Sequence, residues 1–186
     1  LLFLQVIYGN FLYTSSVLMA TFWILVIPLL IIAYYGTYIH SYKHKTNRVL
    51  SLTALGISLV VFLYIAFTFA NNMTLMLHPE KWTVYFENRA GTILNLGDPT
   101  LIPRYLHFLT ASVAVAGLFL ALLWHFRRNK ESGDLVRSNV RNGLHIFGYA
   151  SLLQVLVGIW FLLSQPRNIM MLFMGEGILH TVALAV

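Results

Sequence analysis

The sequence has no cysteine and few charged residues, and both features narrow what the protein can be. Without cysteine, the chain forms no disulfide, attaches no c-type haem and supplies no thiolate to an iron–sulfur cluster. Charged residues make up only 10% of the 186, whereas 59% are hydrophobic. This composition is too apolar for a soluble domain, so we expect an all-α integral membrane protein.

Several functional signatures are also missing from the sequence. It has no GxSxG nucleophile elbow, HExxH zinc pair, Walker loop or GxGxxG fingerprint, which removes support for hydrolase and nucleotide chemistry. No signal-peptide pattern is present at the start. The chain begins at Leu1 and ends at Val186 inside an apolar run, so we expect it to be a fragment of a longer chain.

Apolar runs predict about five transmembrane spans in a single transmembrane helical domain, 1–186. Each run is long enough to cross a bilayer, or nearly so. Pro28 is expected to kink the first span. The predicted spans are about 11–39, 49–70, 101–126, 142–164 and 168–186.

The basic residues predict the orientation of these spans. Eight of the twelve Lys and Arg residues lie in segments 40–48 and 127–141. The positive-inside rule places both segments in the cytoplasm, as in a bacterial-type inner membrane. This placement accounts for the net charge of +6 without a nucleic-acid partner. The long connection 71–100 then faces outward.

The region with the most specific pattern is 98–128. Arg104 and His107 are three residues apart, so they share one face of the predicted helix. Small residues continue that face, which would let a flat group such as haem lie against the backbone. The same small residues also serve ordinary packing between membrane helices.

Depth in the membrane predicts which side chains could share a haem iron with His107. At 1.5 Å per residue, His107 lies roughly 6 Å below the outer end of its span, and His180 roughly 20 Å below the outer end of the last span. Met171 and Met174 match His107 better, and His/Met ligation of haem is known. The two methionines are equal candidates, although methionine also fills gaps in helical cores. Arg104 is placed to pair with a haem propionate.

A second haem is an open alternative at the inner side. His145 is about 6 Å from the inner end of its span by the same rise. His180 is expected about 10 Å from that side of a ~30 Å core, so these two histidines are candidate ligands. A buried histidine can instead form a hydrogen bond between helices.

Two further residues are candidates for a proton relay. Glu176 is the acidic residue expected inside a span, and ionisable groups in a membrane are functional candidates. His78 lies in the outer connection and is the type of side chain that titrates near neutrality. Either could accept protons released during quinol oxidation.

The pattern Asp98-Pro99, Arg104 and His107 resembles subunit I of the cytochrome bd quinol oxidases. There an Asn-Pro pair precedes, at the same spacing, a basic residue and the histidine that ligates the low-spin haem b. Ala70-Asn71-Asn72, followed by Met76-Leu77-His78-Pro79, is similar to the preceding helix of that family. The resemblance covers mainly 49–164 and implies a haem b with a methionine from a later helix as second ligand.

Departures from that family alter the expected activity. The N-terminal histidine that ligates the oxygen-reducing haem, the Gly-Arg-Gln-Pro-Trp segment and the paired glutamates of the third helix have no counterpart here. We therefore do not expect this segment to reduce oxygen.

The sequence thus predicts a membrane electron-transfer subunit that binds haem b, one or two per chain, and takes electrons from quinol within a respiratory complex. Its expected partners are the lipid bilayer, quinone and other membrane or cytochrome subunits. A haem-free membrane anchor is the alternative. A transporter using Glu176 and His180 is a third hypothesis, which the absence of an internal repeat disfavours.

Overall fold

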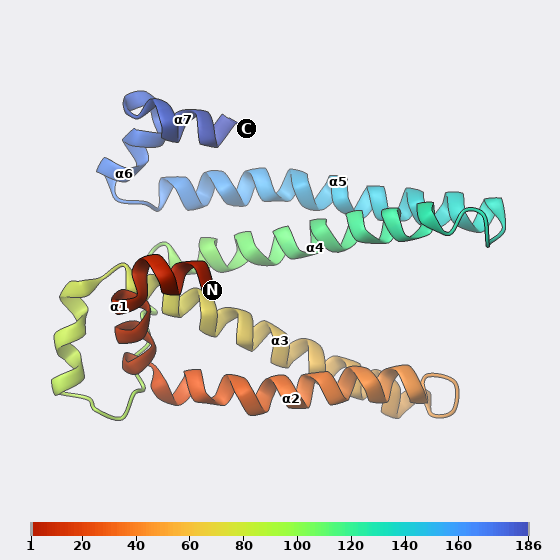
Figure 1. Cartoon of the computed structure of the whole chain (residues 1–186), viewed down its shortest axis with the longest axis horizontal. Helices are drawn as coiled ribbons and strands as arrows, with labels where there is room; N and C mark the ends of the chain where they lie inside the picture. Colours follow the sequence, from red (N-terminus) through yellow and green to blue (C-terminus); the bar gives the residue numbers. More distant parts are fainter. Residues whose placement is uncertain (1, 186) are drawn as a thin grey trace. The chain divides into compact units, whose positions relative to one another are not determined.

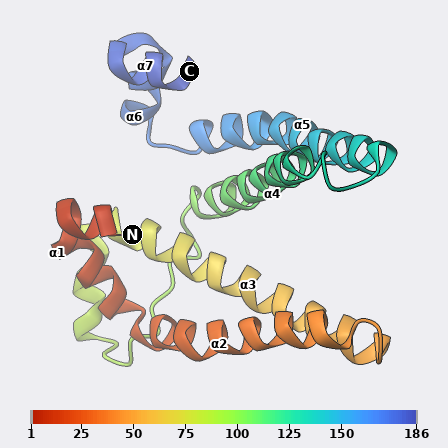
Figure 2. The ribbon, with the colours of Figure 1, turned by 45° about the vertical axis from the view of Figure 1, so that its right-hand side comes forward.

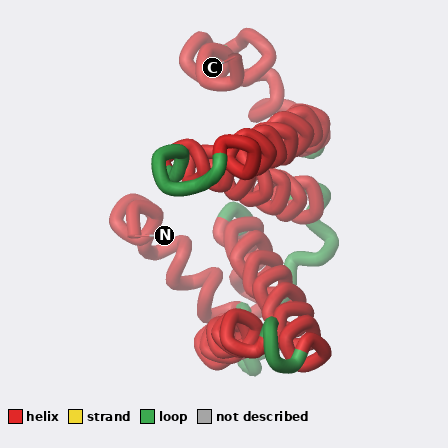
Figure 3. Tube along the Cα trace, turned by 90° about the vertical axis from the view of Figure 1, so that its right-hand side faces the viewer, coloured by secondary structure: helices red, strands yellow, loops and turns green. Residues whose placement is uncertain are grey.

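The computed structural model describes the backbone of residues 2–185 and the side chains of residues 6–184. This part of the chain contains helices and loops and no strand (Figure 3), so the predicted all-α fold is confirmed. In chain order the elements are α1 (Leu2–Leu18), α2 (Ala20–Lys43), α3 (Arg48–Met76), the 3₁₀ helix η1 (Pro79–Phe86), α4 (Leu101–Phe126), α5 (Gly133–Leu163), α6 (Arg167–Met171), the π-helical turn η2 (Leu172–Glu176) and α7 (Ile178–Ala185).

Four helices, α2, α3, α4 and α5, are long and apolar enough to cross a membrane. Between 6% and 22% of the residues in their most apolar windows are buried by protein. Most of their apolar side chains are therefore left for lipid or for other subunits. The chain is an integral membrane protein.

The chain divides into two compact units, Leu1–Leu101 and Ile102–Val186, which we describe separately. In the first unit, α2 packs along α3, and a short turn joins them (Figures 1 and 2). Ser58 of α3 donates to Ala33 O of α2 at 2.9 Å. A Cβ at Gly36 would collide with the Ser58 hydroxyl, so a glycine is needed at this crossing. The predicted single domain stays a prediction.

The predicted first span, 11–39, is wrong in its bounds because the helix breaks at Met19. The backbone there bonds to a distant loop instead of continuing the helix. Ile93 N donates to Leu18 O, and Thr21 N donates to Gly91 O, both at 3.0 Å. No glycine or proline marks this break in the sequence, and α2 continues through Pro28.

Two other helices are longer than the predicted spans. α3 extends to Met76, six residues past the predicted end, and Asn47 caps its start by accepting from Leu50 N. α5 begins at Gly133, so much of the predicted polar segment 127–141 is helical. The bounds of α4 coincide with the predicted 101–126.

The predicted fifth span, 168–186, is not one long helix in the described residues. It is divided into α6, η2 and α7. Gly175 has φ +125°, which a helix does not allow, and Gly177 is extended. The prediction failed because it weighed the apolar composition above these two glycines.

In the second unit, α4 and α5 run side by side and are joined by a short loop (Figures 1 and 2). A Cβ at Gly117 would lie 2.7 Å from Phe147 N, and a Cβ at Gly143 would lie 2.7 Å from Ala121 N. Close backbone contact at small residues is typical of membrane helix pairs. These two glycines therefore determine how closely α4 and α5 approach.

Candidate functional site

The first unit contains a cluster of polar side chains between the end of α3 and the start of α4. We call it the polar cluster, and its members come from the loop after α3, from η1 and from the loop before α4. They are His78, Glu80, Lys81, Asn95, Asp98 and Thr100.

Asp98 is the centre of the polar cluster, and its side chain is 2% exposed. Its Oδ1 accepts from the Thr100 amide at 2.7 Å and from the Thr100 hydroxyl at 2.6 Å. Its Oδ2 faces His78 Nε2 at 2.6 Å and accepts from Asn95 Nδ2 at 3.0 Å. Burial alone raises the pKa of Asp98, but the hydrogen bonds from Thr100 and His78 outweigh it, so the pKa lies below its usual 3.8. Asp98 is therefore a buried carboxylate that is ionised at neutral pH.

His78 connects this buried carboxylate to an exposed one. Its Nε2 faces Asp98, and its Nδ1 lies 2.6 Å from Glu80 Oε1. The side chains of Asp98, His78 and Glu80 are 2%, 32% and 66% exposed, so exposure rises along the chain of contacts. The pKa of Glu80 is lowered by its own backbone hydrogen bond and then by His78. A ring with a proton on each nitrogen donates to both carboxylates, whereas a neutral ring donates to only one.

Amide side chains extend the polar cluster toward α1. Lys81 Nζ donates to Asn95 Oδ1 at 2.6 Å, and Asn95 N donates to Asn71 Oδ1 at 2.9 Å. The next residue, Asn72, donates to Ser16 Oγ at 3.0 Å. Asn72 is 1% exposed, and its Oδ1 has no hydrogen-bond partner among the described residues. A buried acceptor without a donor is costly and calls for an explanation.

Ser16 also lines a hollow of about 390 Å³ on α1 and α2. This volume is within the range of small-ligand sites, and the lining includes the aromatic rings of Tyr13 and Trp23. Asn72 thus contacts the rim of this aromatic hollow, and its chain neighbour Asn71 contacts the polar cluster.

In the second unit, His107 of α4 faces α5. Its Nε2 lies 3.0 Å from Gln154 Nε2, so the amide donates to the ring. The Gln154 carbonyl accepts from the Thr110 hydroxyl. The ring also stacks on Phe161 at 6.1 Å between centroids. His107 is thus part of a polar contact between two membrane helices.

Arg104 lies on the same face of α4, as predicted from its spacing. Its guanidinium carbon is 4.9 Å from the centre of the Phe161 ring, a cation–π distance. Arg104 and His107 therefore contact the same aromatic side chain of α5.

The two ring nitrogens of His107 determine whether this histidine can serve as a haem ligand. Its Nδ1 is buried and has no hydrogen-bond partner among the described residues. Because Nε2 accepts from Gln154, the neutral ring carries its proton on Nδ1, so this nitrogen is an unpaired donor and offers no lone pair to iron. This nitrogen lies 3.7 Å from where a Cβ would stand at Gly158, and Nε2 is held by Gln154. Ligation through Nε2 requires the bond to Gln154 to open.

The predicted second ligands lie in the C-terminal segment. Met171 ends α6, and Met174 lies in η2 and is 60% exposed. The side chains found against His107 come from α5, and neither methionine is among them. The choice between the two methionines stays a prediction.

The candidates for an inner site lie on different helices. His145 of α5 contacts Tyr149, with the ring centroids 6.2 Å apart, and His180 of α7 contacts Phe173 at 5.3 Å. Glu176 ends η2 and is exposed. In the described part of the chain, no ion pair joins Glu176 to His180, and no group of three or more His, Asp or Glu side chains could hold a metal ion.

Sequence reasoning missed several residues of these sites. Gln154 was detectable because it is a polar side chain inside a predicted span, and such residues are functional candidates. Asn71 and Asn72 were noted only for their resemblance to a family pattern. No sequence pattern indicated the roles of Lys81 and Asn95, because the contact between them depends on how the loop folds.

Comparisons of the chain with protein-family models, with curated proteins and with solved structures find no match.

Proposed function

We propose that this integral membrane protein is an electron-transfer subunit that oxidises quinol and passes the electrons to haem b. Oxidation of a quinol releases protons together with electrons, so a quinol site needs groups that accept protons and lead them to water. The observation that carries this proposal is the Asp98–His78–Glu80 chain of contacts, which begins at a buried carboxylate and ends at an exposed one.

The hollow on α1 and α2 gives the quinol a candidate position. Aromatic side chains such as Trp23 suit a flat ring, and Ser16, which lines the hollow, can hydrogen-bond to a ring hydroxyl. Asn72 supports this position from behind, because its amide donates to Ser16 Oγ at 3.0 Å without lining the hollow itself.

His107 is the proposed haem ligand, with Met171 or Met174 as the second ligand and Arg104 as the partner of a propionate. A haem b at this position would supply one-electron chemistry. His145 and His180 remain the candidates for a second haem. Electron transfer to other subunits of a complex, and not to oxygen, completes this proposal.

A haem-free membrane anchor is the second candidate function. It is favoured by the contact between His107 and Gln154, because a hydrogen bond between two helices already gives this histidine a structural role. The exposed apolar faces of α2, α3, α4 and α5 are consistent with contact to other subunits.

The test is a reduced-minus-oxidised optical spectrum of the purified chain and of two single variants, His107→Ala and His145→Ala. We expect a b-type band with chemical reductant, and we expect His107→Ala to abolish it. His145→Ala is the matched control and is expected to keep the outer haem. A colourless wild-type protein would favour the anchor, and a band that survives His107→Ala would move the haem to the inner histidines.

The same samples test the proton path when quinol replaces the chemical reductant. His78→Gln should slow reduction of the haem by quinol at least about tenfold, because a positioned acid–base group typically contributes about 10² to 10⁴. Its spectrum with chemical reductant should be unchanged. Glu87→Gln, an acid of the same loop outside the polar cluster, should not alter the rate. Equal rates in His78→Gln and wild type would rule out this path.

A further inference from the structure

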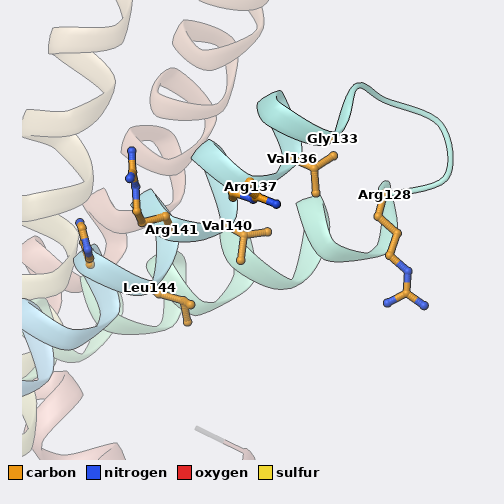
Figure 4. Close-up of a pocket in the computed structure, with 8 residues that line it drawn as sticks. Arg128, Gly133, Val136, Arg137, Val140, Arg141 and Leu144 are labelled. Atoms are coloured by element: carbon orange, nitrogen blue, oxygen red, sulfur yellow. The ribbon is translucent and has the colours of Figure 1, made fainter.

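A hollow of about 500 Å³ lies at the end of the α4–α5 pair, near the loop that joins the two helices (Figure 4). Basic side chains from α5 and from the loop that precedes it line this hollow together with aliphatic side chains of α5. The residues are Arg128, Gly133, Val136, Arg137, Val140, Arg141, Leu144 and His145.

Three arginines give this hollow a positive charge that the protein does not neutralise. Arg128, Arg137 and Arg141 are exposed, and none of them forms an ion pair with a described carboxylate. Arg128 instead contacts the ring of His125 at 2.7 Å. In Figure 4 the three guanidinium groups point in different directions around the hollow. The hollow is therefore attractive to an anion.

The basic end of α5 continues into an apolar face of the same helix. Arg137, Arg141, Leu144, Gly148, Leu152 and Val155 are spaced by three or four residues, so they share one face. A second hollow, of about 480 Å³, follows this face and shares Leu144 and His145 with the first. Its lining is almost entirely apolar beyond His145. An occupant that uses both hollows needs an anionic head and a hydrocarbon chain.

We propose that these two hollows form a binding site for an anionic phospholipid. The phosphate lies at the basic end of α5, where the exposed side chains of Arg137 and Arg141 can turn toward it, and an acyl chain lies along α5 from Leu144 to Val155. Two features support a lipid over a soluble anion. α5 is long and apolar enough to cross the membrane, so its basic end lies at the depth of lipid headgroups. A free phosphate would also leave the apolar hollow unused. This site uses neither His107 nor the polar cluster, although His145, a candidate ligand of a second haem, lines both hollows.

The test measures lipid binding to the whole purified chain in a neutral detergent by native mass spectrometry. The probes are short-chain phosphatidylglycerol, phosphatidylcholine with the same chains, and inorganic phosphate. The test variant is Arg137→Gln with Arg141→Gln. The matched control is Lys43→Gln with Lys45→Gln, which removes the same charge from exposed residues at the α2–α3 turn.

Phosphatidylglycerol should bind wild type more tightly than phosphatidylcholine does. The double arginine variant should weaken its binding by roughly 30-fold, because each basic residue near an anionic lipid contributes about fivefold. The lysine control should bind like wild type, and circular dichroism should show equal helix content in all samples.

Three results would overturn the proposal. Equal binding of phosphatidylcholine would remove the role of the charge, and equal loss in the lysine control would show that only net charge matters. Full competition by inorganic phosphate would identify a soluble-anion site. An arginine variant that loses helix content is replaced by Leu152→Glu, which keeps the arginines and should abolish binding by blocking the acyl chain.

Discussion

Asp98 shows how one buried carboxylate can hold a loop in place. It accepts hydrogen bonds from a backbone amide, a hydroxyl and an amide side chain, and it faces an imidazole. These donors come from the loop before α4 and from His78, just after α3. Hydrogen bonds to a charged group contribute about 1.5–3 kcal/mol each. The ionised form of Asp98 therefore stabilises the loop between α3 and α4.

This arrangement predicts a loss of stability in acid. Because the pKa of Asp98 is lower in the folded chain than its usual 3.8, its contribution is complete above that pH and is lost as the pH falls below it. The thermal unfolding temperature in detergent should drop in that range for wild type. Asp98→Asn should be less stable at neutral pH and should show a weaker pH dependence.

Glu87→Gln is the matched control, since Glu87 is exposed and lies outside the polar cluster. It should unfold like wild type at each pH. If Asp98→Asn retained the full acid sensitivity, another group would be responsible for it.

Residue type and spacing selected His78, Arg104 and His107 as candidates but predicted few of their contacts. The shared face of Arg104 and His107 followed from helix geometry, and His78 was selected because it titrates near neutrality. The partners Gln154 and Asp98 were not assigned to them. A hydrogen bond between residues 47 positions apart, such as that between Gln154 and His107, depends on the packing of two helices, which local patterns do not encode.

At the scale of the helices, two glycines determine the approach of α4 to α5. The atoms nearest to a Cβ at Gly117 or Gly143 are backbone atoms of the other helix, so they cannot move aside as a flexible side chain does. A methyl group at either position must push the helices apart or distort them.

We therefore predict that Gly117→Ala lowers the free energy of unfolding by about 1–3 kcal/mol, the usual cost of overpacking. Gly148→Ala is the matched control on α5, because a Cβ at Gly148 meets no atom within 4 Å. Unfolding in detergent, followed by circular dichroism, measures both. Equal stability of Gly117→Ala and wild type would mean that the two helices do not pack as described.

Helix bounds followed the apolar pattern only where a clear start signal or an uninterrupted run was present. The bounds 101–126 were predicted because this stretch is long enough to cross a bilayer and only Arg104, His107 and His125 in it can carry charge. The break at Met19 was missed because its cause is a loop more than 70 residues later. The division of 168–186 was missed even though Gly175 and Gly177 are visible in the sequence, which shows that glycine spacing deserved more weight than hydrophobicity.

For the whole molecule, the number of long apolar helices determines which loops share a side of the membrane. If all four cross the bilayer in turn, the α2–α3 turn and the α4–α5 loop face one side and the 77–100 connection faces the other. The basic residues are concentrated near the first two, so the positive-inside rule predicts that these two face the cytoplasm.

The lack of cysteine makes this orientation directly measurable. Single cysteines at Lys45, Glu87 and Lys130 give one label site in each connection. A membrane-impermeant maleimide added to intact cells should label Glu87→Cys, and it should label the other two only after lysis. The reverse pattern would invert the orientation and place the polar cluster in the cytoplasm.

The break between α1 and α2 at Met19 has a consequence for biosynthesis. Its hydrogen bonds come from the segment around Gly91, and Thr21 is separated from its partner Ala90 by 69 positions. At about 5–20 residues per second, the ribosome needs roughly 3–14 seconds to synthesise the residues between Thr21 and Ala90. During that interval the backbone groups at the break have no partner from the segment around Gly91, so their hydrogen bonds must come from water, lipid headgroups or the insertion machinery. Folding of the N-terminal part of this protein is therefore completed only after the segment around Gly91, which follows η1, has been made.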